Sequence, residues 1–283
     1  MRRATKKIID ANYLRDDRLA HWLSSSNNNY AVITDYAAME AYKGDTLISI
    51  FKSMDILSRY PDQVLILKNT LTVCRLKPDK KGLQRRLLDE AQTKGFRRYC
   101  AALQKAKEGD SSLQGMLLSL GKEANEHMTQ ALGYAELIKQ AIGEFRLTYS
   151  REELGVLRTH QPLTNSIAKK FRDHVLSVTA ELLAKRSLVQ IIPTRSNFPN
   201  CFIFRSVLCS YLNIMDWISE GGAKDAKRET IRNDMVDVNY AAFATYFDGL
   251  LSKDEKALRI YQQAKYLLDH VFSVGRVAAP DSR

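Results

Sequence analysis

Short apolar runs alternate with helix-like segments over the first 67 residues of this 283-residue chain, and that alternation constrains the fold more than any other feature. Residues 6–9, with the β-branched pair Ile8 and Ile9, and the mainly apolar residues 30–34 and 64–67 predict three strands. The segments between them have the apolar spacing of amphipathic helices. Because strands that alternate with helices form parallel or mixed sheets covered on both faces, we expect an α/β fold.

The middle of the chain has a different character from residue 78 onward. Long charged segments with helical periodicity follow one another there, at residues 83–107, 113–147 and 151–185. We therefore expect a mainly helical insertion over residues 76–199. Residues 1–75 and 200–283 would form one discontinuous α/β domain around it.

The last part of the chain returns to the strand and helix pattern. Residues 227–246 predict a helix with Asp234 and Asp237 on one face, because they are three residues apart. Residues 247–252 predict a short strand, and Asp254 follows at the start of a last helix. Residues 188–193 predict a strand with a signal comparable to the first three, and a weaker signal predicts an edge strand at residues 271–274.

Acidic side chains recur at the ends of the expected strands. Asp10 directly follows the first strand, Glu40 lies in the helix after the second, and Asp254 follows the short late strand. Open α/β sheets bind ligands at the C-terminal ends of their strands. If the strands are neighbours, Asp10, Glu40, Asp237 and Asp254 therefore converge at one edge of the sheet, with Asp234 beside them.

Crowded carboxylates repel one another and raise each other's pKa unless a cation neutralises them. An oxygen-only ligand set without His or Cys suits Mg²⁺ or Mn²⁺. The chain carries 43 Lys and Arg against 32 Asp and Glu, a net charge of +11, which favours a polyanionic partner. Together these features predict a metal-assisted hydrolysis of phosphodiester bonds.

A simpler interpretation of the acids remains open. Acidic residues often cap helix N-termini, which could account for Asp35, Asp234 and Asp254 one at a time. Taken singly, each acid fits a cap better than a ligand. Their order along the chain, at successive strand ends, favours a site.

Four short motifs carry a resemblance to a known family. They are Ile8-Ile9-Asp10-Ala11-Asn12, Glu40 in the helix after residues 30–34, Asn233-Asp234-Met235-Val236-Asp237, and Leu250-Leu251-Ser252-Lys253-Asp254. The arrangement resembles the PIN-domain family of metal-dependent nucleases. The resemblance implies a three-layer fold with a mostly parallel central sheet, and a metal site made by Asp10, Glu40, Asp237 and Asp254.

The same resemblance leaves the third acid open between Asp234 and Asp237. The spacing to the strand favours Asp237, and Asp234 remains a possible metal ligand or a partner of one. Asn12 and Ser252 look like the small polar residues with which the family orients ligands or the scissile phosphate. Such domains usually cleave single-stranded RNA, some as toxins or defence effectors, and a branch acts on DNA. The long middle region departs from the family's compact form.

A basic run at the start of the helical region could bind a phosphate backbone. It includes Arg85, Arg86, Arg97 and Arg98. The alternative is a solvated helix face, because Asp89, Glu90 and Glu108 lie on the same segment.

Composition bears on the compartment and the partners. The four cysteines form no C-x-x-C pair, and we find no signal peptide and no membrane span, so we expect a cytoplasmic protein without a membrane partner. RNA is favoured over DNA as the partner. A nuclease of this kind would also need restraint, by a homo-oligomer or a regulatory protein. A non-catalytic nucleic-acid-binding protein and a DNA nuclease remain the alternatives.

Overall fold

A small parallel sheet lies at the centre of the protein, as shown by a computed structural model that describes residues 3–159, 162–185 and 193–272. Its strands are β1 (Thr5–Ile9), β2 (Asn29–Ile33), β3 (Val64–Ile66) and β4 (Leu250–Leu251), in the order β3-β2-β1-β4. All three pairings are parallel, and Ile8 pairs with both Val32 and Leu250. The expected α/β class is confirmed.

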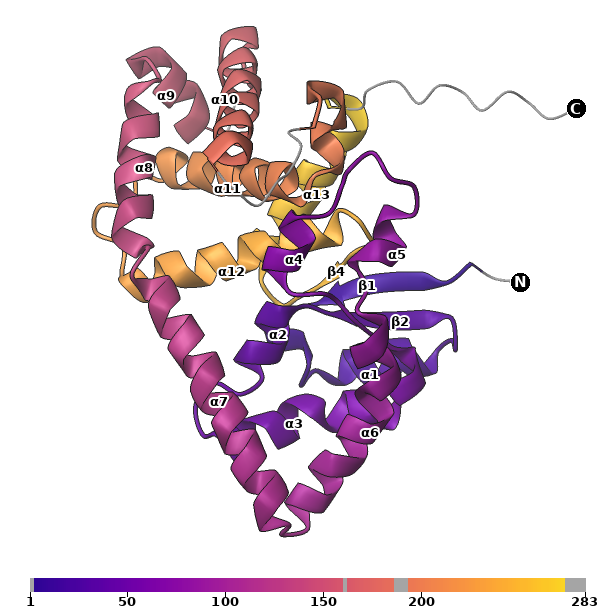
Figure 1. Ribbon diagram of the computed structural model, residues 1–283. Helices are drawn as coiled ribbons and strands as arrows, with labels where there is room; N and C mark the ends of the chain where they lie inside the picture. The colour runs from indigo at the N-terminus through magenta and orange to yellow at the C-terminus, as the bar shows by residue number, and fades with distance from the viewer. Residues whose placement is uncertain (1–2, 160–161, 186–192, 273–283) are drawn as a thin grey trace, which may run out of the picture.

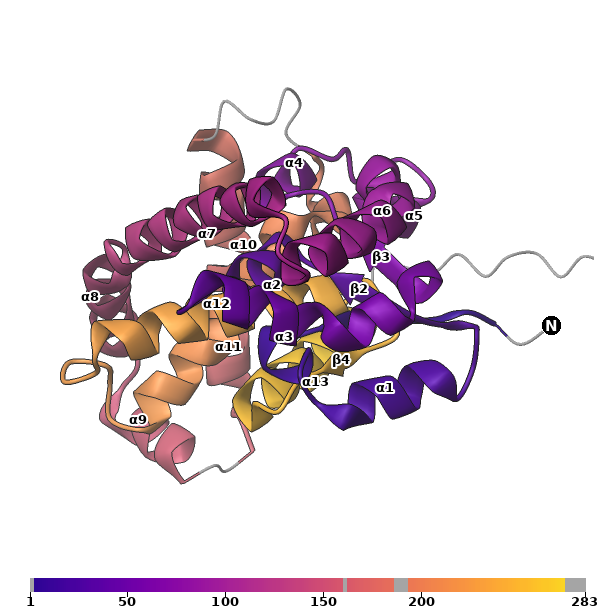
Figure 2. The ribbon, with the colours of Figure 1, turned by 90° about the horizontal axis from the view of Figure 1, so that it is seen from below.

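Helices cover both faces of this sheet. The crossover helices α1 (Asp17–Ser24), α2 (Asp35–Glu40) and α3 (Thr46–Arg59) follow the first two strands. Seen from below, α1 and α3 lie in front of the strands (Figure 2). The helices α11 (Phe202–Ser219), α12 (Arg228–Ala244) and α13 (Glu255–His270) lie above the sheet (Figure 1). Ile8 and Ile9 point to opposite faces and are both fully buried, as a sheet covered on both sides requires.

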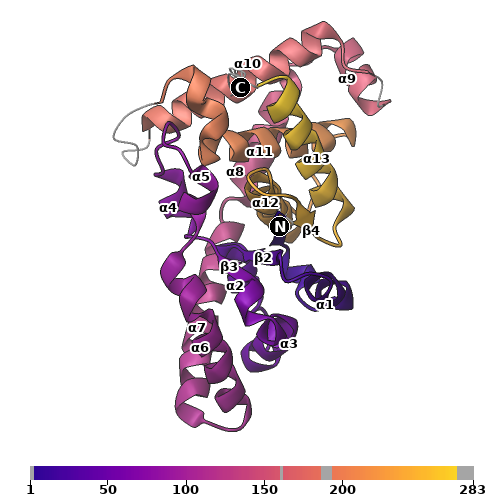
Figure 3. The ribbon, with the colours of Figure 1, turned by 90° about the vertical axis from the view of Figure 1, so that its right-hand side faces the viewer.

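The region between β3 and α11 is helical, as expected. Its helices are α4 (Thr70–Cys74), α5 (Leu83–Leu87), α6 (Glu90–Lys107), α7 (Ser111–Leu132), α8 (Ala135–Leu147), α9 (Arg151–Arg158) and α10 (Asn165–Lys185). A break at Gly133 and Tyr134, which the sequence pattern did not predict, separates α7 from α8. The antiparallel helices α6 and α7 pack together below the sheet (Figure 3).

The chain also forms short 3₁₀ turns at Ala11–Tyr13, Pro61–Gln63 and Arg195–Asn200. The late strand is shorter than the expected residues 247–252. Before β4 the chain turns, with Gly249 at a φ of 154° and the Asp248 amide bonded to Lys6 O at 2.8 Å. The strands expected at residues 188–193 and 271–274 fall largely outside the described residues.

The helical region shares its core with the sheet. One apolar cluster joins strand residues such as Ile8 and Val32 to Phe96 of α6, Leu117 of α7 and Val175 of α10. A second, smaller cluster lies among α8, α9, α11 and α12 and includes Ile142, Leu157 and Ile231. The sheet is therefore embedded in helices from the whole length of the chain.

Candidate functional site

Parallel pairing of β1 with β4 brings the two ends of the chain together at one sheet edge. The amide of Asp10 donates to Leu251 O at 3.0 Å, which extends the pairing by one residue. The hydroxyl of Ser252 donates a short hydrogen bond to Asp10 Oδ2, although these residues are 242 positions apart. Asp10 is 2% exposed, so this bond holds a buried carboxyl in place.

Asn12 and Ser252 fix the turn that carries Asp254. The amide of Lys253 donates to Asn12 Oδ1 at 3.0 Å, and the amide of Asp254 donates to Ser252 Oγ at 2.9 Å. Both residues are thus arranged as orienting groups around two of the expected acids.

Asp254 is also a helix cap. Its Oδ1 accepts from the Ala257 amide at 2.9 Å, which satisfies a free N–H group at the start of α13. Asp35, which was also considered as a cap, instead accepts a hydrogen bond from the Thr70 amide at 2.7 Å, and Thr34 caps α2. The capping interpretation therefore holds for Asp254, whose side chain still lies close enough to other acids to influence them.

Glu40 ends α2 and faces α12. The hydroxyl of Tyr240, a fully buried residue of α12, donates to Glu40 Oε2 at 2.8 Å. Burial raises the pKa of Glu40; the Tyr240 hydrogen bond lowers it, the charge of Asp10 raises it, and the charges of Lys43 and Arg232 lower it. Glu40 and Asp10 thus lie within electrostatic reach of each other.

Asp237 lies at the centre of this group of acids. Burial raises its pKa to about 8, and the charges of Asp254, Asp10, Asp234 and Glu40 act in the same direction. Among the described residues, no hydrogen bond or ion pair reaches its carboxyl. Burial likewise raises the pKa of Asp10, where Asp254 adds to the effect and the bonds from Ser252 and Asn12 oppose it. All four expected acids are therefore electrostatically coupled.

Asp234 differs from Asp237 in its partners. Its Oδ2 accepts from Trp217 Nε1 and from Lys256 Nζ, both at 2.7 Å. A lysine therefore compensates this buried charge, and the indole and the lysine join α12 to α11 and α13. Of Asp234 and Asp237, Asp237 is the one whose carboxyl has neither a lysine nor an indole partner among the described residues.

The carboxylates have oxygen donors that suit a hard divalent cation, but they are not gathered around one point. Within the described ranges, no group of three or more Asp, Glu, His or Cys side chains is arranged to hold a metal ion. A bound ion would have to draw these side chains together.

The arginines expected to bind phosphate lie elsewhere and have other partners. Arg85 pairs with Glu90 at 3.3 Å, and Arg86 donates to Lys77 O at 2.8 Å. Arg97 forms an ion pair with Asp62, which precedes β3 and so lies at the opposite end of that strand from the acids. Arg98 is exposed. These four residues are not brought to the acidic edge.

Several residues around the acids were missed in the sequence. They are Lys43, Trp217, Arg232, Tyr240 and Lys256. Tyr240 had a usable signal, because it follows Asp237 by three residues and so shares its helix face. The others had none, because their contacts join separate helices.

Comparison of the chain with known proteins found no similar protein. No protein-family model, no curated protein and no solved structure matches the chain. In the part of the chain that the structure describes, no helix is long and apolar enough to cross a membrane.

Proposed function

We propose that this protein is a nuclease dependent on Mg²⁺ or Mn²⁺, with a PIN-like fold, that cleaves single-stranded RNA. The observation that supports this most is the environment of Asp237, where burial first, and then the charges of Asp254, Asp10, Asp234 and Glu40, raise the pKa of its carboxyl to about 8. Acids that gather near the C-terminal ends of parallel strands are suited to bind cations. The net charge of +11 favours a polyanionic substrate.

Each residue has a role in this proposal. Asp10, Glu40, Asp237 and Asp254 would supply the metal ligands, with Asp234 beside them. Bound ions would activate a water and neutralise charge on the phosphate. Ser252 and Tyr240 orient Asp10 and Glu40 through their hydrogen bonds. Because protons and cations compete for the same carboxylates, metal binding would release protons near neutral pH.

Cleavage of a labelled single-stranded RNA with Mn²⁺ tests this function. Asp10→Asn and Asp237→Asn should lose at least the roughly 10- to 100-fold in activity that loss of a ligand's supporting partner causes. Asp55→Asn is the matched control, because Asp55 is an exposed acid of α3 whose one ion-pair partner in the described part of the chain is Arg59. Equal cleavage rates for the parent and both site variants, with native circular dichroism, would disprove the assignment.

A non-catalytic nucleic-acid-binding protein is the second candidate. It is favoured by the structural roles of the acids, since Asp254 caps α13 and Asp234 pairs with Lys256. Calorimetry separates the two functions: the nuclease binds Mn²⁺ through Asp237 and the binding protein does not. Parallel digestion of RNA and DNA strands of one sequence decides the substrate.

A further inference from the structure

A large groove with basic walls lies between α8, α9 and the loop that joins α11 to α12. We call it the α8–α9 groove; its volume is about 1260 Å³. Five cationic side chains line it, namely Lys139, Arg146, Arg151, Arg158 and Lys224. Two acids, Glu136 and Glu144, also line it. The groove therefore has an excess of three positive charges.

The acids of the groove do not neutralise its exposed cations. Glu136 is occupied by Arg228 at 3.1 Å and Lys139 at 3.5 Å, and the bond from Arg228 is the main reason that its pKa is lowered. Arg151, Arg158 and Lys224 are exposed and have no carboxylate partner among the described residues. These three charges are free to meet a ligand.

Arg146 is held in a fixed position across the groove. Its Nη1 donates to Gly221 O at 2.9 Å, which joins α8 to the loop before α12. This partner is a neutral carbonyl, so the guanidinium charge is not cancelled. A positioned arginine of this kind is well suited to a phosphate oxygen.

Apolar side chains form the floor between these cations. Ile142, Tyr149 and Ala223 are buried members of the second apolar cluster. Leu147, also in the groove lining, is 85% exposed. Cations that alternate with apolar surface match a single strand, whose phosphates and unpaired bases are both accessible.

The groove leads to the acidic edge along α12. Lys224 precedes this helix, and Arg228 and Arg232 lie within it on the way to Asp237. From Arg228 to Asp237 the helix rises about 14 Å. At roughly 3.4 Å for each stacked nucleotide, this distance corresponds to about four nucleotides.

We infer that the α8–α9 groove binds the phosphate backbone of the single-stranded nucleic acid whose cleavage we propose, a few nucleotides from the acids. This inference rests on the proposed function for its choice of ligand. It assigns backbone binding to Arg146, Arg151, Arg158 and Lys224 in place of the α6 arginines.

Two matched triple variants test the groove against α6. The first is Arg151→Glu, Arg158→Glu and Lys224→Glu. The second is Lys94→Glu, Arg98→Glu and Lys105→Glu, which reverses three exposed cations of α6. Binding to labelled RNA and DNA strands of about 20 nucleotides, a length that exceeds most single binding sites, is measured with EDTA over a range of salt.

The groove triple should weaken binding at least about tenfold. It should also reduce the slope of log K against log salt concentration by about 2, because three phosphate contacts are lost. The α6 triple should change affinity less than about twofold. Loss of affinity for either strand through the groove triple supports the inference. Unchanged binding, or a larger loss through the α6 triple, overturns it.

Two further measurements separate folding and catalysis from the groove. If the charge-reversed triple does not fold, the Arg151→Gln, Arg158→Gln and Lys224→Gln triple takes its place, and its binding is judged by the same criteria. Mn²⁺ calorimetry on the parent reports the proposed function separately. If the groove triple weakens nucleic-acid binding but the parent does not bind Mn²⁺, the groove assignment is supported and the nuclease function is refuted. If the parent binds Mn²⁺ but the groove triple binds nucleic acid normally, the nuclease function is supported and the groove assignment is refuted.

Discussion

Single residues in this protein serve structure and the candidate site at once. Asp254 caps α13 through Oδ1 and also raises the pKa of Asp237 and Asp10. Asp234 and Asp237 are one helical turn apart, yet only Asp234 has a lysine partner. Acid identity and spacing alone do not separate these roles, because they depend on which neighbouring helix faces each carboxyl.

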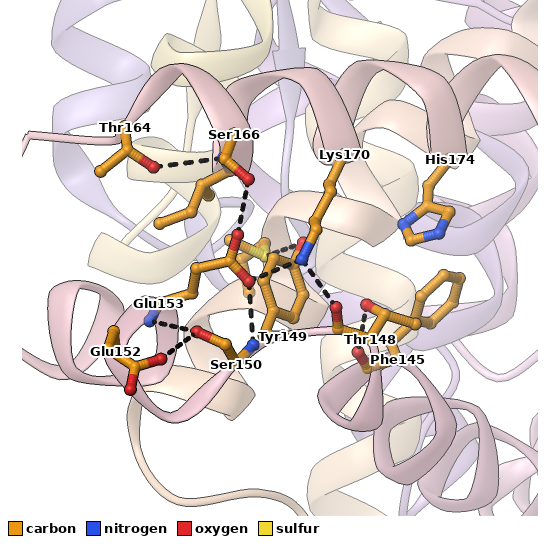
Figure 4. Close-up of polar contacts among 12 residues, drawn as sticks. Phe145, Thr148, Tyr149, Ser150, Glu152, Glu153, Thr164, Ser166, Lys170 and His174 are labelled. Carbon is orange, nitrogen blue, oxygen red and sulfur yellow. Dashed lines mark hydrogen bonds and ion pairs between the residues drawn. The ribbon is translucent and has the colours of Figure 1, made fainter.

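Glu153 shows the same dependence on neighbours in a purely structural role (Figure 4). Its carboxyl accepts from Lys170 at 2.6 Å, from the Ser150 amide at 2.9 Å and from Ser166 at 2.8 Å. These bonds, with Lys170 first, lower its pKa to about 2. They join the start of α9 to α10.

Glu153→Gln should lower the free energy of unfolding by about 1 kcal/mol at pH 6. The pKa of Glu153 is depressed in the folded state, so its contribution is complete above the unfolded value of about 4.3 and is lost as pH falls towards about 2. Urea unfolding of parent and variant between pH 6 and pH 3 measures this convergence.

Glu152→Gln is the control for that measurement. Glu152 is exposed, and among the described residues its carboxyl accepts a side-chain hydrogen bond from the Ser150 hydroxyl alone, at 2.6 Å. We expect no measurable change in the free energy of unfolding, as is usual for a substitution of an exposed side chain. Equal losses in the two variants, or a difference that does not depend on pH, would contradict the role of Lys170.

At the scale of elements, close packing decides how α7 crosses α3. Gly121 of α7 is buried against Thr46, the first residue of α3. A Cβ placed on Gly121 would overlap Thr46 Cγ2 and lie 2.6 Å from Thr46 Oγ1. The glycine therefore permits α7 to approach Thr46 of α3 more closely than a residue with a side chain would allow.

Gly121→Ala should destabilise the protein by about 1 kcal/mol, because an overpacking cost of roughly 1–3 kcal/mol exceeds the helix propensity gain. Gly115→Ala, in the same helix with nothing within 4 Å of its Cβ, should instead stabilise it by about 0.8 kcal/mol. Urea unfolding compares the two. Adding Thr46→Ala should recover part of the loss at Gly121, and stabilisation by Gly121→Ala itself would refute the contact.

At the scale of the whole molecule, the shared core predicts cooperative unfolding. The two tryptophans, Trp22 in α1 and Trp217 in α11, lie in separate parts of the protein. Trp217 packs against the smaller apolar cluster, and Phe145 and Met215 contact both clusters. The two clusters are thus joined by common side chains.

Single-tryptophan variants, Trp22→Phe and Trp217→Phe, should each unfold in urea with one transition. In each variant the fluorescence and circular dichroism midpoints should coincide, because the reporting tryptophan belongs to the same cooperative unit. Separate midpoints would show that the helical region and the sheet unfold independently. That result would instead favour the division into residues 76–199 and a surrounding domain.

Local sequence patterns were enough to predict the strand and helix alternation, the helical middle region and the acids that follow strands. These features depend on local periodicity and on caps such as Thr34, so a window of a few residues contains the information. The sequence also placed Ser252 and Asn12 beside the acids through the family resemblance.

Contacts between residues far apart in the sequence could not be predicted and became known from the folded chain. The hydrogen bond between Asp10 and Ser252 joins positions 242 apart, and Lys256 pairs with Asp234 rather than with Asp237. The α8–α9 groove is lined by two helices and by a loop more than sixty residues later in the chain. Arg97 forms an ion pair with Asp62, at the end of β3 opposite the acids. Such contacts depend on how helices cross and pack against the sheet, which no local pattern specifies.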